Sequence, residues 1–234
     1  MTSTNSNNWE GQIKAQIRRR YASQAKRPAP RGGAKAVETG YPADLINNLP
    51  TTLTANYSGC GYLFSGMSFN GTETVINLGA GGGLDSFIAA QQVPNGMVIS
   101  IDMTIEMLQN INTRNIHNLC ADIEHLPLDD ACADIIISNA SFNLTINKET
   151  AFKEAYRTLK KGGQLVARDL IKIEDLPAEV LTDPLSYSTS LGGALEEDAL
   201  VSIIEKSGFA GVTISDHRPF SFVHSVKIEA TKPR

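Results

Sequence analysis

The 234-residue chain is predicted to fold as an α/β domain with a mostly parallel sheet covered by helices on both faces. Strand-length apolar runs alternate with segments of helical periodicity, which is typical of parallel strands joined by crossover helices. Residues 135–137 are three consecutive isoleucines, as in a strand that is buried on both faces. Residues 79–83 read Gly-Ala-Gly-Gly-Gly between an apolar run at 74–78 and a helical pattern at 84–92, which predicts strand, glycine loop and helix.

The N-terminal part is expected to form a helical arm. Trp9, Ile13, Ile17 and Tyr21 recur at four-residue spacing, which predicts an amphipathic helix over residues 9–24. The arginines at 18–20 are interpreted as a solvated face, with an anion site as the alternative. Residues 27–42 hold three prolines and several glycines, as a linker would. We expect 1–40 to be an arm and linker that folds over the main domain, 41–234, as a lid.

The other elements are assigned in chain order from apolar periodicity and from turn residues. Pro50 is expected to stop a short helix within 41–49, and 51–69 is expected to be irregular. Thr104 is a candidate helix cap, and Gly162-Gly163 a candidate helix stop. The expected strands are 74–78, 97–101, 116–119, 133–138, 164–169, 212–215 and 222–230, and the remaining expected helices are 84–92, 105–114, one from 152 to the glycine pair, and 194–207.

Composition narrows the functional class. Hydrophobic residues make up 41% and charged residues 20%, so the chain is globular. The net charge of -4 predicts no general attraction to nucleic acid, and no apolar run approaches the ~20 residues that span a bilayer. Cys60, Cys120 and Cys132 form neither a metal-spaced cluster nor a disulfide framework, and residues 1–8 are polar. We expect a cytoplasmic protein with a small-molecule partner; the sequence predicts no oligomeric state.

The glycine loop and two carboxylates indicate a nucleoside site. Glycine lets the backbone approach a ligand closely, and a helix start offers free N–H groups; an ordinary strand–helix connection is the alternative. Asp102 ends the next strand, where its carboxylate can accept two hydrogen bonds from a ribose diol, or it is a surface carboxylate. Asp122 could accept from an adenine amino group with Ile123 against the ring, or be a loop carboxylate. Leu84 stands where a dinucleotide loop needs glycine, which favours S-adenosylmethionine over NAD.

Several stretches carry a family resemblance, spread over about residues 41–211. With them, the chain resembles the class I S-adenosylmethionine-dependent methyltransferases, is closest to the arsenite methyltransferases and is more distantly similar to the ubiquinone/menaquinone methyltransferases. The stretches are Ser58-Gly59-Cys60-Gly61, residues 75–85, 96–108 with Ile101-Asp102-Met103-Thr104, 121–128, Ser138-Asn139, 152–163 and Leu191-Gly192-Gly193-Ala194-Leu195.

The resemblance implies a Rossmann-like sheet of seven strands, the last antiparallel. It also implies that the glycine loop lies under the methionine tail, that Asn139 sits near the sulfonium and that Tyr21 helps to close the site. The expected cofactor-binding residues are Tyr21, Gly79, Ala80, Gly81, Gly83, Asp102, Met103, Asp122, Ile123 and Asn139.

The departures from the family concern the acceptor. Arsenic methylation in that family uses cysteine thiolates to hold As(III), and a soft metalloid needs several of them. Cys60 matches the first, but Ala140 and Ser190 stand where the family has cysteines. Arsenite is therefore not the expected acceptor. Asn77 also replaces the usual acid of the first motif, and we expect weaker cofactor binding at most.

The candidate acceptor residues are Cys60, Ala140, Tyr187 and Ser190. Residues 187–190 would line the acceptor pocket with hydroxyls, or form a polar loop that caps the next helix. A general base is needed only if the nucleophile is protonated. Asp169, at the end of the fifth strand, and His125, in the loop before the fourth, are the candidates, each with a structural role as the alternative.

The predicted function is methyl transfer from S-adenosylmethionine to a small molecule other than arsenite. Two alternatives stay open. One is a protein that binds S-adenosylmethionine without transfer, or uses it for another reaction, which Asn77 and the lost cysteines would favour. The other is retained arsenic chemistry through Cys60 alone.

Overall fold

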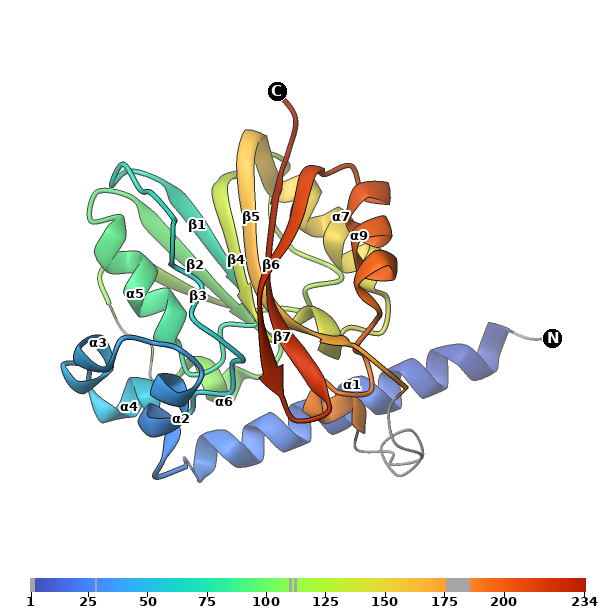
Figure 1. The fold of residues 1–234 in the computed structure, drawn as a ribbon, viewed down its shortest axis with the longest axis horizontal. Helices are drawn as coiled ribbons and strands as arrows, with labels where there is room; N and C mark the ends of the chain where they lie inside the picture. The colour runs from blue at the N-terminus through green and yellow to red at the C-terminus, as the bar shows by residue number, and fades with distance from the viewer. Residues whose placement is uncertain (1–2, 28, 110, 112, 176–185) are drawn as a thin grey trace.

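The computed structural model describes residues 3–27, 29–109, 111, 113–175 and 186–234, and its centre is one seven-stranded sheet (Figure 1). The strand order is β3-β2-β1-β4-β5-β7-β6, with β7 antiparallel to both of its neighbours and the other pairs parallel. The predicted sheet of seven mostly parallel strands with the last one antiparallel is confirmed. The strands are β1 Thr74–Leu78, β2 Met97–Asp102, β3 Ile116–Cys120, β4 Ala133–Asn139, β5 Leu159–Lys172, β6 Ala210–Phe220 and β7 Val223–Thr231.

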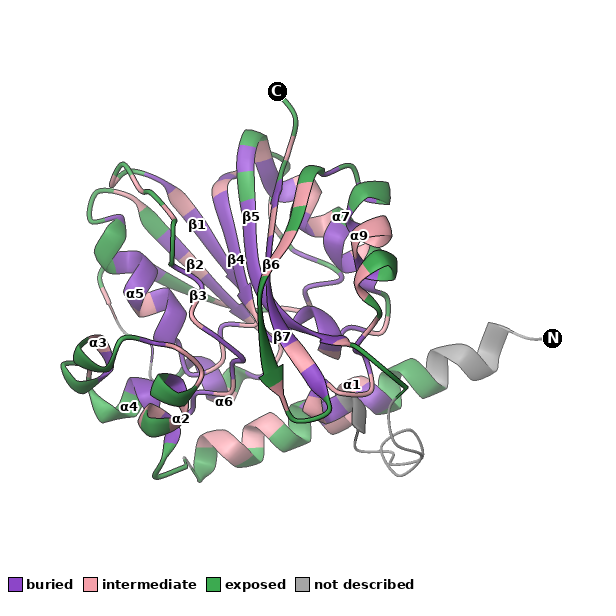
Figure 2. Cartoon of the chain, viewed as in Figure 1, coloured by how far each residue is buried: buried purple, intermediate pink, exposed green. Residues whose placement is uncertain are grey.

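Helices cover both faces of the sheet, as expected (Figure 1). On one face α7, Lys148–Thr158, and α9, Glu197–Lys206, contribute Phe152 and Ile204 to a core. On the other face α5, Leu84–Gln92, contributes Leu84 and Ile88 to a second core. The central β4 is buried along most of its length (Figure 2), which explains its run of three isoleucines.

The N-terminal segment is more helical than the sequence pattern predicts. Helix α1 spans Ser3–Lys26 and lies across the end of the sheet where the parallel strands finish (Figure 1). Residues expected to be a linker contain α2, Gly32–Glu38. The short helix expected within 41–49 is present as α3, Ala43–Asn47, whereas α4, Thr51–Thr54, lies in a segment expected to be irregular. The linker prediction was wrong because tertiary packing overrides local composition. Gly32 lies so close to the carbonyls of Thr54 and Ala55 that no side chain would fit there.

Two helix ends also differ from the prediction. Helix α6 is only Ile105–Leu108, because the Asn118 side chain donates to the carbonyls of Leu108 and Ile111 and replaces further helical bonds. Helix α7 ends before the glycine pair, since Leu159 already pairs with Ala133 of β4.

The Thr104 hydroxyl makes no capping bond to α6. No helix in the described part of the chain has the length and apolar character needed to cross a bilayer.

Candidate functional site

The glycine loop turns the chain sharply between β1 and α5. Gly79 and Gly83 have φ of 70° and 87°, the left-handed region that favours glycine. A Cβ atom on Gly79 would overlap the Ser141 hydroxyl, and one on Gly83 would overlap Ile111. The loop is held by the Ala80 N–H, which donates to the carbonyl of Ile101 at 2.8 Å. It therefore presents bare backbone at the end of the sheet.

A first cavity opens against this loop, between the ends of β1, β2 and β4 and the overlying α1. Most of the predicted cofactor-binding residues line it. Gly83 does not, since it lies behind the loop as the residue that precedes α5. The predicted residues that line the first cavity are Tyr21, Gly79, Ala80, Gly81, Asp102, Met103, Asp122, Ile123 and Asn139.

Asp102 is fixed by the loop that it faces. Its Oδ2 accepts from the Gly81 N–H at 2.9 Å, and its Oδ1 accepts from the Thr104 N–H at 2.8 Å. Burial raises the pKa of this carboxyl, while the two backbone N–H groups counteract the rise. Because each carboxylate oxygen accepts more than one hydrogen bond, both oxygens retain acceptor capacity toward the cavity.

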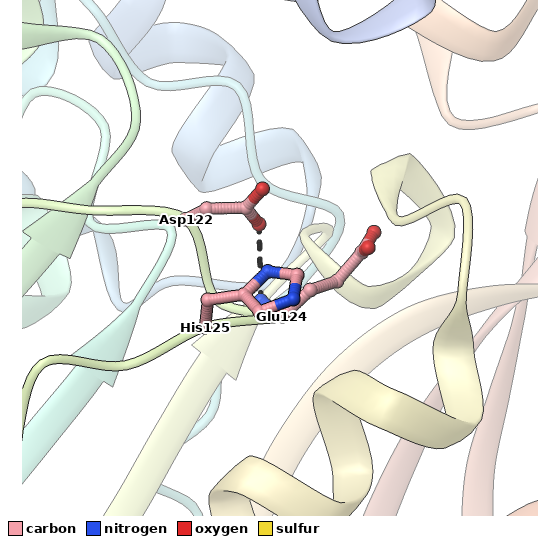
Figure 3. A group of neighbouring side chains, drawn as sticks. All are labelled: Asp122, Glu124 and His125. Atoms are coloured by element: carbon pink, nitrogen blue, oxygen red, sulfur yellow. Dashed lines mark hydrogen bonds between the residues drawn. The ribbon is translucent and has the colours of Figure 1, made fainter. Parts of the chain in front are cut away.

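Asp122 has a partner that the sequence did not indicate. The Lys14 ammonium on α1 donates to Asp122 Oδ2 at 2.6 Å and to Glu124 Oε2 at 2.7 Å. Asp122 Oδ1 accepts from the Glu124 N–H at 3.0 Å (Figure 3). Asp122, Glu124 and His125 bring one possible ligand atom each within 4.8 Å of one another, but Lys14 already supplies the cation there. No signal in the sequence links Lys14 to residues more than 100 positions away.

Asn139 is held by the protein itself. Its Oδ1 accepts from the Cys60 N–H at 2.9 Å, and its amide nitrogen lies 3.0 Å from Asp85 Oδ2 and 2.9 Å from the Gly61 carbonyl. Asp85, which lines the first cavity, also accepts from the Tyr41 hydroxyl at 2.5 Å. Burial raises the pKa of Asp85 to about 6. Asn139 therefore joins the Cys60 loop to a buried carboxylate that sequence reasoning missed.

Two other asparagines lie near the glycine loop, and only one of them lines the first cavity. Asn77 does not line it; its amide donates to the Ser86 hydroxyl at 2.9 Å, between β1 and α5. Any effect of Asn77 on cofactor binding would therefore act through the position of the glycine loop. Asn56 lines the cavity beside Gly82, is 2% exposed, and neither polar atom of its side chain has a hydrogen-bond partner in the described structure. It was not predicted, and its position in an irregular segment carried no signal.

A second cavity adjoins the first. Cys60, Ala140 and Ser190, the three positions singled out for the acceptor, all line it, although they are far apart in the sequence. The side chain of Tyr187 lies outside the described residues, so its predicted role stays a prediction. Burial is the main cause that raises the pKa of the Cys60 thiol, to about 12. This side chain is therefore a neutral thiol near pH 7.

The two cavities share four lining residues, Tyr21, Tyr57, Ser58 and Ala140. Tyr21 on α1 thus stands at the boundary between them. Burial raises its pKa to about 12, so its hydroxyl keeps its proton and can donate a hydrogen bond.

The two candidate bases line neither cavity. Asp169 is buried, and its oxygens accept from the N–H groups of Asn143 at 3.1 Å and Leu170 at 2.9 Å. Burial raises its pKa to about 6. His125 is exposed beside Asp122 (Figure 3). Both positions fit the structural alternative, and a catalytic role for either stays a prediction.

A matching family model and two relatives of known function are all described as methyltransferases. A family model described as a methyltransferase domain matches residues 70–208. The chain is 32% identical over 216 residues to an arsenite methyltransferase of Halobacterium salinarum, a match that covers 83% of this chain and 55% of the relative. It is 28% identical over 222 residues to the human arsenite methyltransferase, covering 86% of this chain and 59% of the relative.

Among solved structures, an arsenic(III) S-adenosylmethionine methyltransferase from Chlamydomonas reinhardtii superimposes with a TM-score of 0.69 at 24% identity, covering 88% of this chain and 74% of the other. This likeness shows the fold. The chain spans about half the length of the curated arsenite methyltransferases it matches, between 48% and 59%. It belongs to the methyltransferase-domain family, and the predicted resemblance to class I S-adenosylmethionine-dependent methyltransferases near the arsenite methyltransferases is confirmed.

Proposed function

We propose that this protein binds S-adenosylmethionine in the first cavity and transfers its methyl group to a small molecule, other than arsenite, in the second. The observation that carries the proposal is that the cavities meet at Tyr21 and Ala140. A reaction between two bound molecules needs their reacting atoms to be held together, and adjoining cavities provide that proximity.

When bound, S-adenosylmethionine supplies an activated methyl group on a sulfonium. The residues of the chain bind and orient it. Gly79 and Gly81 allow close approach of the backbone, Asp102 accepts from the ribose hydroxyls, and the unpartnered amide of Asn56 is available to the polar tail. The buried Asp85 carboxylate places negative charge on the cavity wall, which favours a cationic ligand.

Helix α1 acts as the lid in this proposal. Ile17 and Tyr21 line the first cavity from above, and Lys14 ties the helix to Asp122 and Glu124. With α1 docked, the cavity encloses about 90 Å³, whereas sites for small molecules typically measure about 300 Å³ or more. Admission of the cofactor therefore requires α1 to shift, and its return would exclude water from the reaction. The sequence predicted a lid from residues 1–40, and the proposal assigns that role to α1 alone.

The second cavity does not suit arsenite. Of the three positions, only Cys60 carries sulfur, and its thiol is neutral near pH 7. The thiolate is the metalloid ligand, and a soft trivalent centre needs several. Ala140 has no ligand atom, and the Ser190 hydroxyl points to the Ala140 carbonyl at 3.4 Å.

The test combines binding with turnover. Calorimetry should show S-adenosylmethionine binding to the purified protein. Formation of S-adenosylhomocysteine should then depend on a metabolite extract and not on arsenite with a thiol reductant. Binding without product in any extract would favour the alternative of a cofactor-binding protein without transfer. Product that appears with arsenite and disappears in Cys60→Ser would favour retained arsenic chemistry.

A further inference from the structure

The second cavity carries an unusual distribution of charge. It measures about 550 Å³, within the range of about 300–1,000 Å³ typical of small-molecule sites. Arg20, Arg27 and Lys35 line it, and no aspartate or glutamate is among its described lining residues. The whole chain carries a net charge of -4, so a cavity with three cations and no acid departs from the average surface.

These three cations lack the partners that neighbouring cations have. Lys26 forms an ion pair with Glu106 at 3.7 Å, and Arg31 forms one with Glu38 at 3.8 Å. Among the described residues, no ion pair involves Arg20, Arg27 or Lys35. Two arginines and a lysine of like charge thus share a cavity wall without an ion-pair partner in the described part of the chain.

Lys35 is the most informative of the three, because it is half-buried while the two arginines are exposed. Its ammonium lies 6.0 Å from the centre of the Tyr57 ring. Burial lowers its pKa, and the nearby charge of Arg20 lowers it further. A bound anion would offset both penalties. Three acids act electrostatically on residues of this wall: Asp169 on Cys60 and Tyr21, Asp102 on Tyr21, and Asp85 on Tyr57. None of the three lines the cavity, and the oxygens of Asp169 are bonded to backbone N–H groups.

The rest of the wall includes a neutral thiol from Cys60 and the hydroxyls of Ser58 and Ser190. In the described structure these hydroxyls donate only long bonds to backbone carbonyls, at 3.3 and 3.4 Å, which a ligand oxygen can replace. Hydroxyl donors and guanidinium groups match the oxygens of carboxylates and phosphates, and arginine can bind either in a bidentate manner. Such a wall suits an oxyanion far better than a cation or a soft metalloid.

We propose that the second cavity recognises an anionic acceptor that carries a carboxylate or a phosphate group, held by Lys35, Arg20 and Arg27. The inference rests on the proposed methyl transfer and names its substrate class. The anionic group is the handle, and the nucleophilic atom is the one that reaches the boundary at Tyr21. There a lone pair of the nucleophile would form the new bond to the methyl carbon of S-adenosylmethionine. The electron pair of the broken methyl–sulfur bond would stay on the sulfur, and any proton of the nucleophile would leave to water.

The first test measures binding without turnover. Wild type, Lys35→Gln and Arg20→Gln are titrated by calorimetry with inorganic phosphate and, separately, with acetate. Arg18→Gln is the matched control, because Arg18 is an exposed arginine of the same helix that lines neither cavity. We expect wild type and the control to bind at least one anion, and Lys35→Gln to bind it about tenfold more weakly or worse. The preferred anion shows whether the handle is a phosphate or a carboxylate. No binding to wild type, or equal binding to Lys35→Gln, overturns the proposal.

The second test measures turnover on an extract separated by charge. S-adenosylhomocysteine should form with the anionic fraction, and Lys35→Gln should raise the apparent KM for it by about tenfold with S-adenosylmethionine affinity unchanged. Product with only the neutral or cationic fraction overturns the anionic acceptor but leaves methyl transfer standing. No product from any fraction, with phosphate or acetate still bound through Lys35, removes the proposed reaction and leaves the anion site standing.

Discussion

Replacement of Asp102 tests the cofactor site most specifically. Each of its oxygens accepts one backbone N–H, from Gly81 at 2.9 Å and from Thr104 at 2.8 Å. This clamp fixes the carboxylate with lone pairs left for two ribose hydroxyls. In Asp102→Ala both proposed contacts to the ribose would be lost. The net loss should be about 2–3 kcal/mol of binding free energy, on the order of a hundredfold in the Kd for S-adenosylmethionine.

Calorimetry with S-adenosylmethionine and with S-adenosylhomocysteine measures the effect, and the two should weaken alike because both carry the ribose. Urea denaturation is run beside it, since the N–H groups of Gly81 and Thr104 lose their acceptor and the variant will be less stable. Asp102→Asn, which keeps one acceptor oxygen, should fall between the two proteins. A folded Asp102→Ala protein with unchanged affinity would refute the ribose role.

Three further predictions follow from the same contacts. Lys14→Met removes two charge-assisted hydrogen bonds that hold α1, so S-adenosylhomocysteine should be released about fivefold faster or more in stopped flow. The control Lys26→Met, whose partner Glu106 is 3.7 Å away, should not change the release rate. Equal release rates for the two variants would show that Lys14 does not hold the lid. Burial raises the pKa of Asp85 from 3.8 to about 6, so the folded state binds the proton more tightly and the wild type loses stability as pH rises through 6. In urea denaturation, the stability of Asp85→Asn relative to wild type should therefore increase by up to about 3 kcal/mol between pH 4 and 7. A stability difference that does not change with pH would contradict this. Gly83→Ala should cost more stability than Gly81→Ala. Both glycines have positive φ, but only at Gly83 would the added Cβ atom overlap Ile111. The reverse order in thermal unfolding would show that the loop relaxes around the new side chain.

Local pattern was sufficient for most of the fold. The isoleucines at 135–137 predicted a central strand, and the glycine run predicted the turn that shapes the first cavity. The errors lie where distant residues decide the local structure. Gly32 starts a helix because it packs on the carbonyls of residues 54 and 55, and Asn118 replaces the helical bonds that would have continued α6.

In the candidate site, too, local pattern identified some residues, whereas others are placed by contacts with distant parts of the chain. Asp102 and Asp122 were identified because they follow strands, and the ends of parallel strands meet at one edge of the sheet. Lys14, Asn56 and Lys35 come from the N-terminal segment, where no pattern indicates which surface they will cover. The positions equivalent to the family's cysteines were found by resemblance. The sequence offered an anion site only as the alternative for the arginines at 18–20, and the place of Arg20, Arg27 and Lys35 beside those positions was visible only in three dimensions.

The most direct test of the central claim is to follow the methyl group itself. S-adenosylmethionine with a ¹³C-labelled methyl group is incubated with the purified protein, a metabolite extract and, in a parallel sample, arsenite with a thiol reductant. Mass spectrometry then locates the label. The label should appear in a small organic anion of the extract, and no methylated arsenic should form. Label in an arsenic species, or bound S-adenosylmethionine with no label transferred, would contradict the account.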